Sequence, residues 1–174
     1  MTCIYKKGRL LCLLMMASSM LMAQSNLMDK DSLLSSIRSL QERLKGVEVS
    51  TTTNDREANR FVQKCMLFAK SYPKDSLSKQ FVFMAADVSR GLGNYIKAIE
   101  YWQLYYDTYP DTRLHPVSIF LMGFTYYENL KDQDKAKIYF NKFLKKYPAH
   151  ELARDAKVFL IAAEDILQSG SSKN

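Results

Sequence analysis

The sequence has few of the residues that interrupt helices or cross-link a chain. Its 174 residues include 6 Gly, 4 Pro and 3 Cys. Sparse Gly and Pro disfavour a many-stranded sheet, which needs frequent turns. Cys3 and Cys12 lie in the first 23 residues, so Cys65 is the one cysteine of the remaining chain and cannot form an internal disulfide there. Since 47% of the residues are hydrophobic, we expect an all-α fold stabilised by packing alone.

Groups suited to catalysis or metal binding are also scarce. The two histidines, His115 and His150, each follow a Tyr-Pro pair, and neither has a spaced set of further metal ligands. We expect both to be solvated at helix starts. Cys65 shares a helix face with Phe61 and Phe68, so we expect a buried, inert thiol. With no phosphate-binding glycine loop, nucleophile elbow or zinc-protease motif in the sequence, we predict no catalysis, no cofactor and no metal.

Acidic residues are absent from the first 23 positions, which hold three basic residues. The apolar run Leu10–Met16 follows the basic residues, and small residues then lead to Ala23. This pattern predicts a signal peptide at 1–23 and a periplasmic or secreted protein. Cleavage after Ser19 and retention of the segment as a membrane anchor are the alternatives. The apolar run is shorter than the roughly 20 residues that a spanning helix needs, so we expect no integral span after cleavage.

Tyr-Pro pairs mark an internal repeat. They end at Pro73, Pro110 and Pro148, with spacings of 37 and 38 residues. At 12, 8 and 5 residues before each Pro stand Phe61, Cys65 and Phe68, then Ala98, Trp102 and Tyr105, then Ala136, Phe140 and Phe143. Offsets of 4 and 3 place these side chains on one helix face, and Pro ends the helix. Each Tyr-Pro therefore predicts the end of a second helix of a helical hairpin.

The segments between these stops predict the other helices. We expect helices at about 31–46, 76–90, 95–109, 116–129, 135–147 and 150–168, with Asn94 as the cap of the one that starts at Tyr95. We expect residues 24–54 to form an N-terminal amphipathic helix and a Thr-rich linker (Val49–Asp55). Residues 55–168 are expected to form the repeat domain, and residues 169–174 a flexible tail.

The repeat resembles the tetratricopeptide repeat family. The residues that carry the resemblance are Ala85-Ala86, Gly93, Tyr95, Ala98, Trp102, Tyr105 and Pro110, and a second copy from Ile119 to Pro148 has one extra residue in its turn. Ser89 departs from the pattern because an aromatic residue is usual there. The resemblance covers about residues 55–168 and implies a short right-handed solenoid with an extra N-terminal helix. The chain is most similar to exported bacterial members such as the periplasmic coordinator of the Tol–Pal system and the repeat subunit of the outer-membrane β-barrel assembly machine.

The N-terminal helix carries an apolar stripe. Its members are Leu33, Ile37, Leu40, Leu44 and Val47, with steps of 4, 3, 4 and 3 residues. Two heptads are short for a stable coiled coil. We expect this helix to pack on the repeats, with weak self-association through residues 31–47 or a loose helix as the alternatives.

The resemblance implies a scaffold that binds a protein or peptide partner in the cell envelope. An accessory domain of an envelope enzyme system, or a module that binds peptidoglycan or sugar through the Tyr-rich segment Tyr101–Tyr109, is the alternative. We expect no nucleic-acid partner, because removal of residues 1–23 lowers the net charge from +7 to +4. The basic pairs Lys145-Lys146 and Lys135/Lys137 are interpreted as a solvated outer face rather than a phosphate site.

The first helices of the hairpins are expected to line a concave binding face. Its predicted members are Gln80, Phe83, Asp87, Arg90, Val117, Phe120, Phe124, Tyr127 and Glu128, with Val158 as a continuation of the floor. Some family members hold carboxylates with Lys and Asn at these positions, and that clamp is absent here. An apolar or mixed peptide is therefore the predicted ligand. The alternative is that part of this aromatic set is core.

Overall fold

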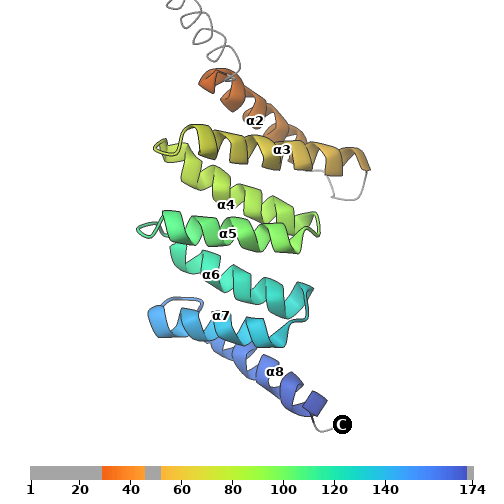
Figure 1. Ribbon diagram of the computed structural model, residues 1–174, viewed down its shortest axis with the longest axis vertical. Helices are drawn as coiled ribbons and strands as arrows, with labels where there is room; N and C mark the ends of the chain where they lie inside the picture. The colour runs from red at the N-terminus through yellow and green to blue at the C-terminus, as the bar shows by residue number, and fades with distance from the viewer. Residues whose placement is uncertain (1–28, 46–51, 172–174) are drawn as a thin grey trace, which may run out of the picture. The chain divides into compact units, whose positions relative to one another are not determined.

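The computed structural model describes residues 29–45 and 52–171, so the predicted signal peptide at 1–23 lies outside the described residues. In this part of the chain the structure is helical and contains no strand. The α-helices are α2 (Lys30–Leu44), α3 (Thr52–Ser71), α4 (Ser76–Gly91), α5 (Tyr95–Thr108), α6 (His115–Phe124), α7 (Gln133–Lys146) and α8 (Ala153–Ser171), and the π-helical segment η1 (Thr125–Asn129) continues α6 (Figure 1).

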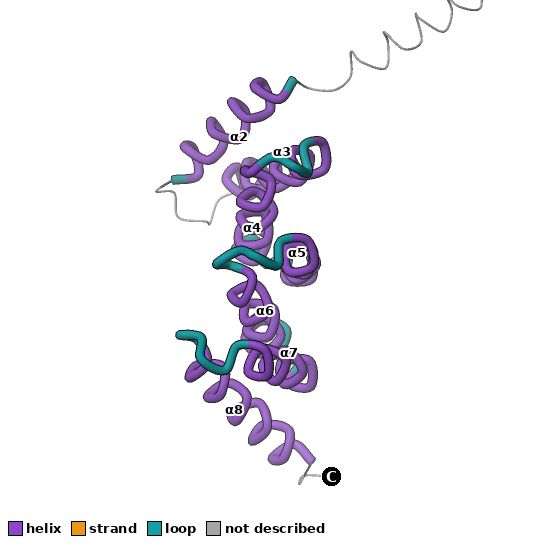
Figure 2. The backbone as a smooth tube through the Cα atoms, turned by 90° about the vertical axis from the view of Figure 1, so that its left-hand side faces the viewer, coloured by secondary structure: helices purple, strands orange, loops and turns teal. Residues whose placement is uncertain are grey.

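The chain divides into two units after Ser36, within α2. In the second unit, each helix from α3 to α8 packs against the next helix along the chain. Figure 2 shows α4, α6 and α8 along one side of this stack and α3, α5 and α7 along the other. This arrangement confirms the predicted all-α solenoid of helical hairpins. A single hairpin cannot bury its own apolar face, so neighbouring hairpins must stack to complete a core.

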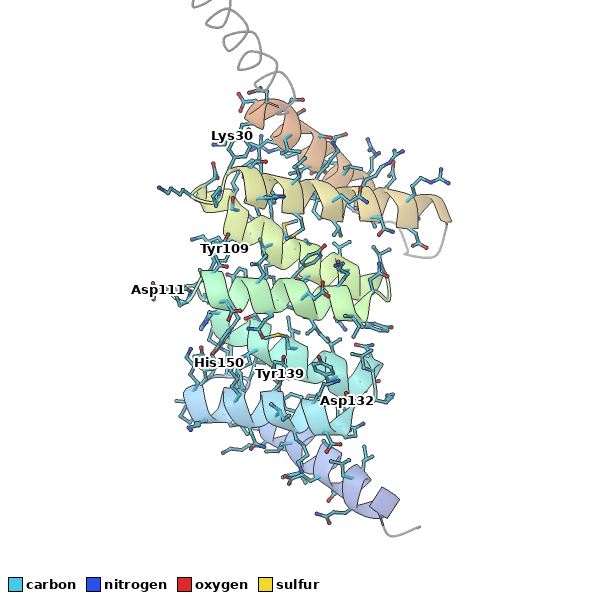
Figure 3. The ribbon with its side chains drawn as sticks, in the orientation of Figure 1. Lys30, Tyr109, Asp111, Asp132, Tyr139 and His150 are labelled. Atoms are coloured by element: carbon cyan, nitrogen blue, oxygen red, sulfur yellow. The ribbon has the colours of Figure 1, made fainter. Side chains whose placement is uncertain are left out.

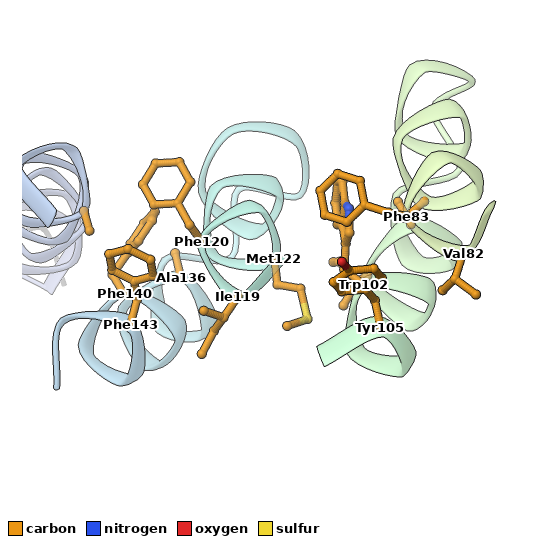
Figure 4. Close-up of a cluster of buried hydrophobic side chains, with 14 of the residues drawn as sticks. Val82, Phe83, Trp102, Tyr105, Ile119, Phe120, Met122, Ala136, Phe140 and Phe143 are labelled. Atoms are coloured by element: carbon orange, nitrogen blue, oxygen red, sulfur yellow. The ribbon is translucent and has the colours of Figure 1, made fainter. Parts of the chain in front are cut away.

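Equivalent residues of successive repeats form the core. Trp102 of α5 and Phe140 of α7 are both 0% exposed, and Tyr105 and Phe143 are buried one turn later. Figure 4 shows these rings between consecutive helices of the stack, with Met122 of α6 nearby. The predicted register of the repeat is confirmed. The N-terminal helix α2 has its own buried side chains, Leu33, Ile37 and Leu40, at the predicted steps.

The helix ends follow the predicted stops. The backbone N–H groups of Tyr72, Tyr109 and Tyr147 each donate to the carbonyl four residues earlier, and each Tyr is followed by Pro. Asp75 caps α4 through a 2.8 Å hydrogen bond from Leu77 N–H. Asn94 occupies the N-cap position of α5, but the prediction of a side-chain cap is wrong. No side-chain cap hydrogen bond forms at Asn94.

The extra residue of the second repeat lies in a helix and not in the turn. The turns before α5 and α7 both have three residues, 92–94 and 130–132. The additional residue is absorbed by η1, where Leu130 N–H donates to the carbonyl of Thr125, a π-type bond across five residues. The sequence spacing revealed an insertion between Gly123 and Ala136 but could not locate it.

Two helices extend into segments that were predicted as a linker and a tail. Helix α3 begins at Thr52, inside the segment predicted as a linker, with Asp55 in its first turn, where the helix dipole favours an acidic residue. Helix α8 extends to Ser171, inside the predicted tail. The Ser169 hydroxyl donates to the Ile166 carbonyl in that last stretch.

Candidate functional site

A pocket of about 600 Å³ lies between α4 and the turn that leads from α5 to α6. Its lining consists of Lys79, Gln80, Phe83, Met84, Asp87, Tyr105, Asp111, Thr112, Arg113 and Leu114. Three residues of the predicted concave face, Gln80, Phe83 and Asp87, therefore meet in one hollow. Figure 3 shows Asp111 at the end of α5 near Tyr109, where the chain turns toward α6.

The floor of this pocket is a fixed aromatic pair. The rings of Phe83 and Tyr105 meet edge to face with centroids 5.1 Å apart. The Tyr105 hydroxyl donates to Thr112 Oγ1 at 2.8 Å, and the Thr112 hydroxyl donates to the Tyr109 carbonyl. These bonds hold the turn against the hairpin. Sequence reasoning assigned Tyr105 to the core and missed Thr112 and Arg113, because the repeat spacing carries no signal for turn residues.

The Asp87 carboxyl gives the pocket a titratable group. Burial raises the pKa of Asp87 to about 6, and Arg90 and the indole of Trp102 lower this pKa in part. Asp87 is an exposed residue of α4, so this desolvation of its carboxyl is partial. Trp102 Nε1 is buried without a hydrogen-bond partner of normal geometry. A cationic group of a ligand at Asp87 would stabilise the ionised carboxylate in place of the missing water.

The predicted aromatic residues of α6 and η1 have a different role. Phe120 is buried, and the rings of Phe124 and Tyr127 lie 5.2 and 5.3 Å from the ring of Phe159 on α8. These residues therefore hold α8, which is the alternative that the sequence left open for part of the set. The expectation that Val158 continues the floor stays a prediction. Val158 is 57% exposed, because the next residue, Phe159, faces the aromatic cluster.

The remaining predicted members of the concave face are Arg90, Val117 and Glu128. The Arg90 guanidinium is 6.0 Å from the centroid of the Phe124 ring, and Val117 is half-buried against the core. Glu128 is exposed and pairs with Lys131 at 3.6 Å. Hence the structure brings Gln80, Phe83 and Asp87 together but separates them from Glu128. Their role in binding stays a prediction.

The prediction of a solvated His115 is wrong. His115 is 4% exposed and stacks on Tyr106 with centroids 4.2 Å apart. Its Nε2–H donates to the Tyr106 carbonyl at 3.0 Å, so Nδ1 is the acceptor for the Tyr147 hydroxyl at 2.7 Å. Burial and the nearby Lys146 lower the pKa of His115. The sequence predicted that His115 lies at a helix start. It did not predict that Tyr106 and Tyr147 contact the imidazole ring.

The other reactive candidates are local structural groups. His150 lies half-buried in the turn before α8, where Nδ1 accepts the Leu152 N–H at 3.2 Å. Cys65 is 0% exposed, so the predicted burial of this thiol is confirmed, and burial raises its pKa to about 12. Within residues 29–45 and 52–171, no three His, Cys, Asp or Glu side chains gather as a metal site, and no helix has the length and hydropathy to cross a bilayer.

Stacked helical hairpins with an aromatic core at fixed offsets define an all-α repeat protein. Residues 118–150, which include most of α6 and all of η1 and α7, match the family model of the tetratricopeptide repeat. The match supports a protein-interaction scaffold, the role typical of this repeat. No curated protein matches the chain.

Proposed function

We propose that the chain is an exported adaptor that binds a peptide or a segment of a partner protein in the pocket beside α4, without catalysis. The supporting observation is the pocket in which Gln80, Phe83 and Asp87 converge. Pockets that combine an apolar floor with a few polar groups are typical binding sites.

The pocket chemistry favours an apolar side chain next to a basic one. Phe83 and Tyr105 provide a rigid aromatic floor that a ligand reaches without reorganising the site. Asp87 and Asp111 provide the anionic groups of the lining, which also includes the cations Lys79 and Arg113. A partner segment with an apolar anchor and a neighbouring Lys or Arg fits this arrangement.

Export is the part of the proposal that rests on sequence alone. The basic start, the short apolar run and Ala23 support cleavage before Gln24. N-terminal sequencing of the native protein from an envelope fraction tests it. A cytosolic chain that starts at Met1 would contradict export and leave the binding proposal intact.

The binding proposal calls for variants that change the pocket and spare the core. Phe83 is a poor choice because it is buried, and its removal would disturb α5 as well. The double variant Gln80→Ala with Asp87→Ala changes two exposed residues of the lining. Gln103→Ala with Asp107→Ala on α5 is the matched control, since this pair has the same residue types and lies outside the pocket.

The measurement begins with affinity purification from the cell envelope and continues with the dissociation constant of the partner found. We expect the pocket variant to bind at least about tenfold more weakly, or about 1.4 kcal/mol, and the control to bind within about twofold of the wild type. Equal affinity of all three proteins would exclude the pocket as the binding surface.

A further inference from the structure

A second polar cluster lies away from this pocket, where α5, the start of α6 and the end of α7 meet. Its centre is the ring of Tyr106 on α5. His115 covers one face of that ring, with centroids 4.2 Å apart and an angle of 11° between the planes. The ammonium groups of Lys142 and Lys146 lie 4.7 and 4.9 Å from the same ring centroid. Since His115 occupies one face, both ammonium groups lie on the other face or at the edge of the ring.

The cluster has hydrogen-bond donors in excess. Lys146 Nζ donates to the Tyr106 hydroxyl at 3.0 Å, and the side chains of Lys146 and Tyr106 each also interact with Tyr147. Both ring nitrogens of His115 are occupied, one by the Tyr147 hydroxyl and the other by the Tyr106 carbonyl. The remaining N–H groups belong to Lys142 and Lys146, and both residues are exposed. An anionic acceptor can replace water at these groups.

Acidic side chains do not supply that acceptor in the described part of the chain. No ion pair joins a carboxylate to Lys142 or Lys146 there. Asp107 and Asp111 are the nearby acids that act on His115, and the Asp107 carboxylate accepts hydrogen bonds from Gln103. Two ammonium groups next to one ring and without a carboxylate repel each other, so an anion between them would be stabilised by both.

The other end of α7 offers an internal comparison. Lys135 also lies over a tyrosine ring, 5.2 Å from the centroid of Tyr126, but its ammonium group pairs with Asp132 at 2.8 Å. Lys137 pairs with Glu164 at 3.7 Å. The same lysine-on-tyrosine arrangement is therefore neutralised at one end of α7 and left cationic at the other.

We propose that Lys142 and Lys146 form an oxyanion site beside the Tyr106 ring that binds a phosphate group. The two ammonium groups, one turn apart on α7, lie close to the same ring without a carboxylate partner, which suits the charge and the several acceptor oxygens of a phosphate. Lysine binds phosphate as a compact point charge and needs no planar match.

The test is a titration of the full chain with sodium phosphate against sodium chloride at constant ionic strength, followed by NMR. We expect a saturable shift at Tyr106, Lys142 and Lys146 that chloride does not produce. Lys142→Gln with Lys146→Gln should weaken phosphate binding at least about tenfold. The control Lys135→Gln with Lys137→Gln makes the same charge change on the same helix and should alter affinity less than about twofold.

A second arm uses vesicles of phosphatidylcholine with and without an equal share of phosphatidylglycerol. Saturable binding of free phosphate that the Lys142, Lys146 variant loses supports the site with a soluble ligand. Binding to the anionic vesicles alone, lost in the same variant, supports it with a lipid phosphate as the source. Absence of saturable binding to both probes, or equal loss in the control, would overturn the proposal.

Discussion

At the residue scale, Asp87 is an exposed residue of α4 whose carboxyl is still partly desolvated. Its pKa is raised to about 6 because burial penalises the ionised carboxyl more than Arg90 and Trp102 favour it. Trp102 cannot compensate fully, since its Nε1 makes no hydrogen bond of normal geometry. The pocket thus contains an anionic group that is under-solvated before any ligand arrives.

This environment predicts a pH-dependent effect of Asp87→Asn. The folded-state pKa lies above the ordinary value of 3.8, so the folded protein binds the proton more tightly than the unfolded chain. Ionisation of Asp87 therefore costs stability as the pH rises from about 4 to about 6, and the cost stays constant at higher pH. We expect the melting temperature of the variant to exceed that of the wild type at pH 7 and the difference to vanish below pH 4. Melting curves across this range check it.

Asp107→Asn is the control for this experiment, because Asp107 is exposed on α5 and accepts its bond from Gln103. Asp107→Asn should not reproduce the rise between pH 4 and pH 6. A difference between Asp87→Asn and the wild type that is the same at every pH would contradict the raised pKa.

The sequence predicted single residues well where periodicity decides burial. Trp102, Phe140 and Cys65 follow from offsets along one helix and are all 0% exposed. His115 was mispredicted because its partners, Tyr106 and Tyr147, come from two other parts of the repeat. The packing of Phe120, Phe124 and Tyr127 against α8 was not predicted for a related reason. Whether Phe124 faces solvent depends on the next helix, where Phe159 covers it.

At the element scale, the hairpin of α6 and α7 depends on close approach at Gly123. A Cβ atom at this position would lie 3.1 Å from two carbons of the Phe140 ring and 3.1 Å from Tyr139 Cβ. Phe140 and Tyr139 are themselves held by stacked neighbours, Phe159 and Tyr126. The tetratricopeptide-like spacing predicted a small residue here, and the structure gives the physical reason.

Gly123→Ala should therefore destabilise the protein although alanine favours a helix. We expect a loss of roughly 1–3 kcal/mol in the free energy of unfolding, the usual cost of overpacking. Gly91→Ala is the matched control, because a Cβ at the end of α4 meets no atom within 4 Å. Urea unfolding of both variants measures the two effects. Similar stability of the two variants would mean that α6 and α7 can separate at little cost.

The position of the insertion in the second repeat lay beyond sequence reasoning. A spacing of 38 rather than 37 residues shows that one residue has been added. A longer turn and a π-helical segment both accommodate it, and the spacing does not distinguish between them. The Thr125 carbonyl accepts from Leu130, while Thr125 Oγ1 and Asn129 Oδ1 are buried without a partner.

At the scale of the whole molecule, the stack from α3 to α8 is built from contacts between neighbours along the chain. Stability in such an array is a sum over hairpins and their interfaces, and a terminal element must close the last apolar face. Helix α8 has this role through Phe159, whose ring lies within 6.2 Å of the rings of Phe120, Phe124, Tyr127 and Phe140.

Phe159→Ala should consequently destabilise the whole repeat domain. We expect a loss of roughly 2–4 kcal/mol in unfolding free energy, somewhat below the full cost of a buried Phe because Phe159 is half-buried. Val158→Ala should stay within about 0.5 kcal/mol of the wild type, since Val158 is 57% exposed. A short array of this size should unfold cooperatively, so circular dichroism and the fluorescence of the single tryptophan, Trp102, should shift together. Loss of helix signal at lower denaturant with an unshifted Trp102 transition would show that α8 melts locally and does not cap the stack.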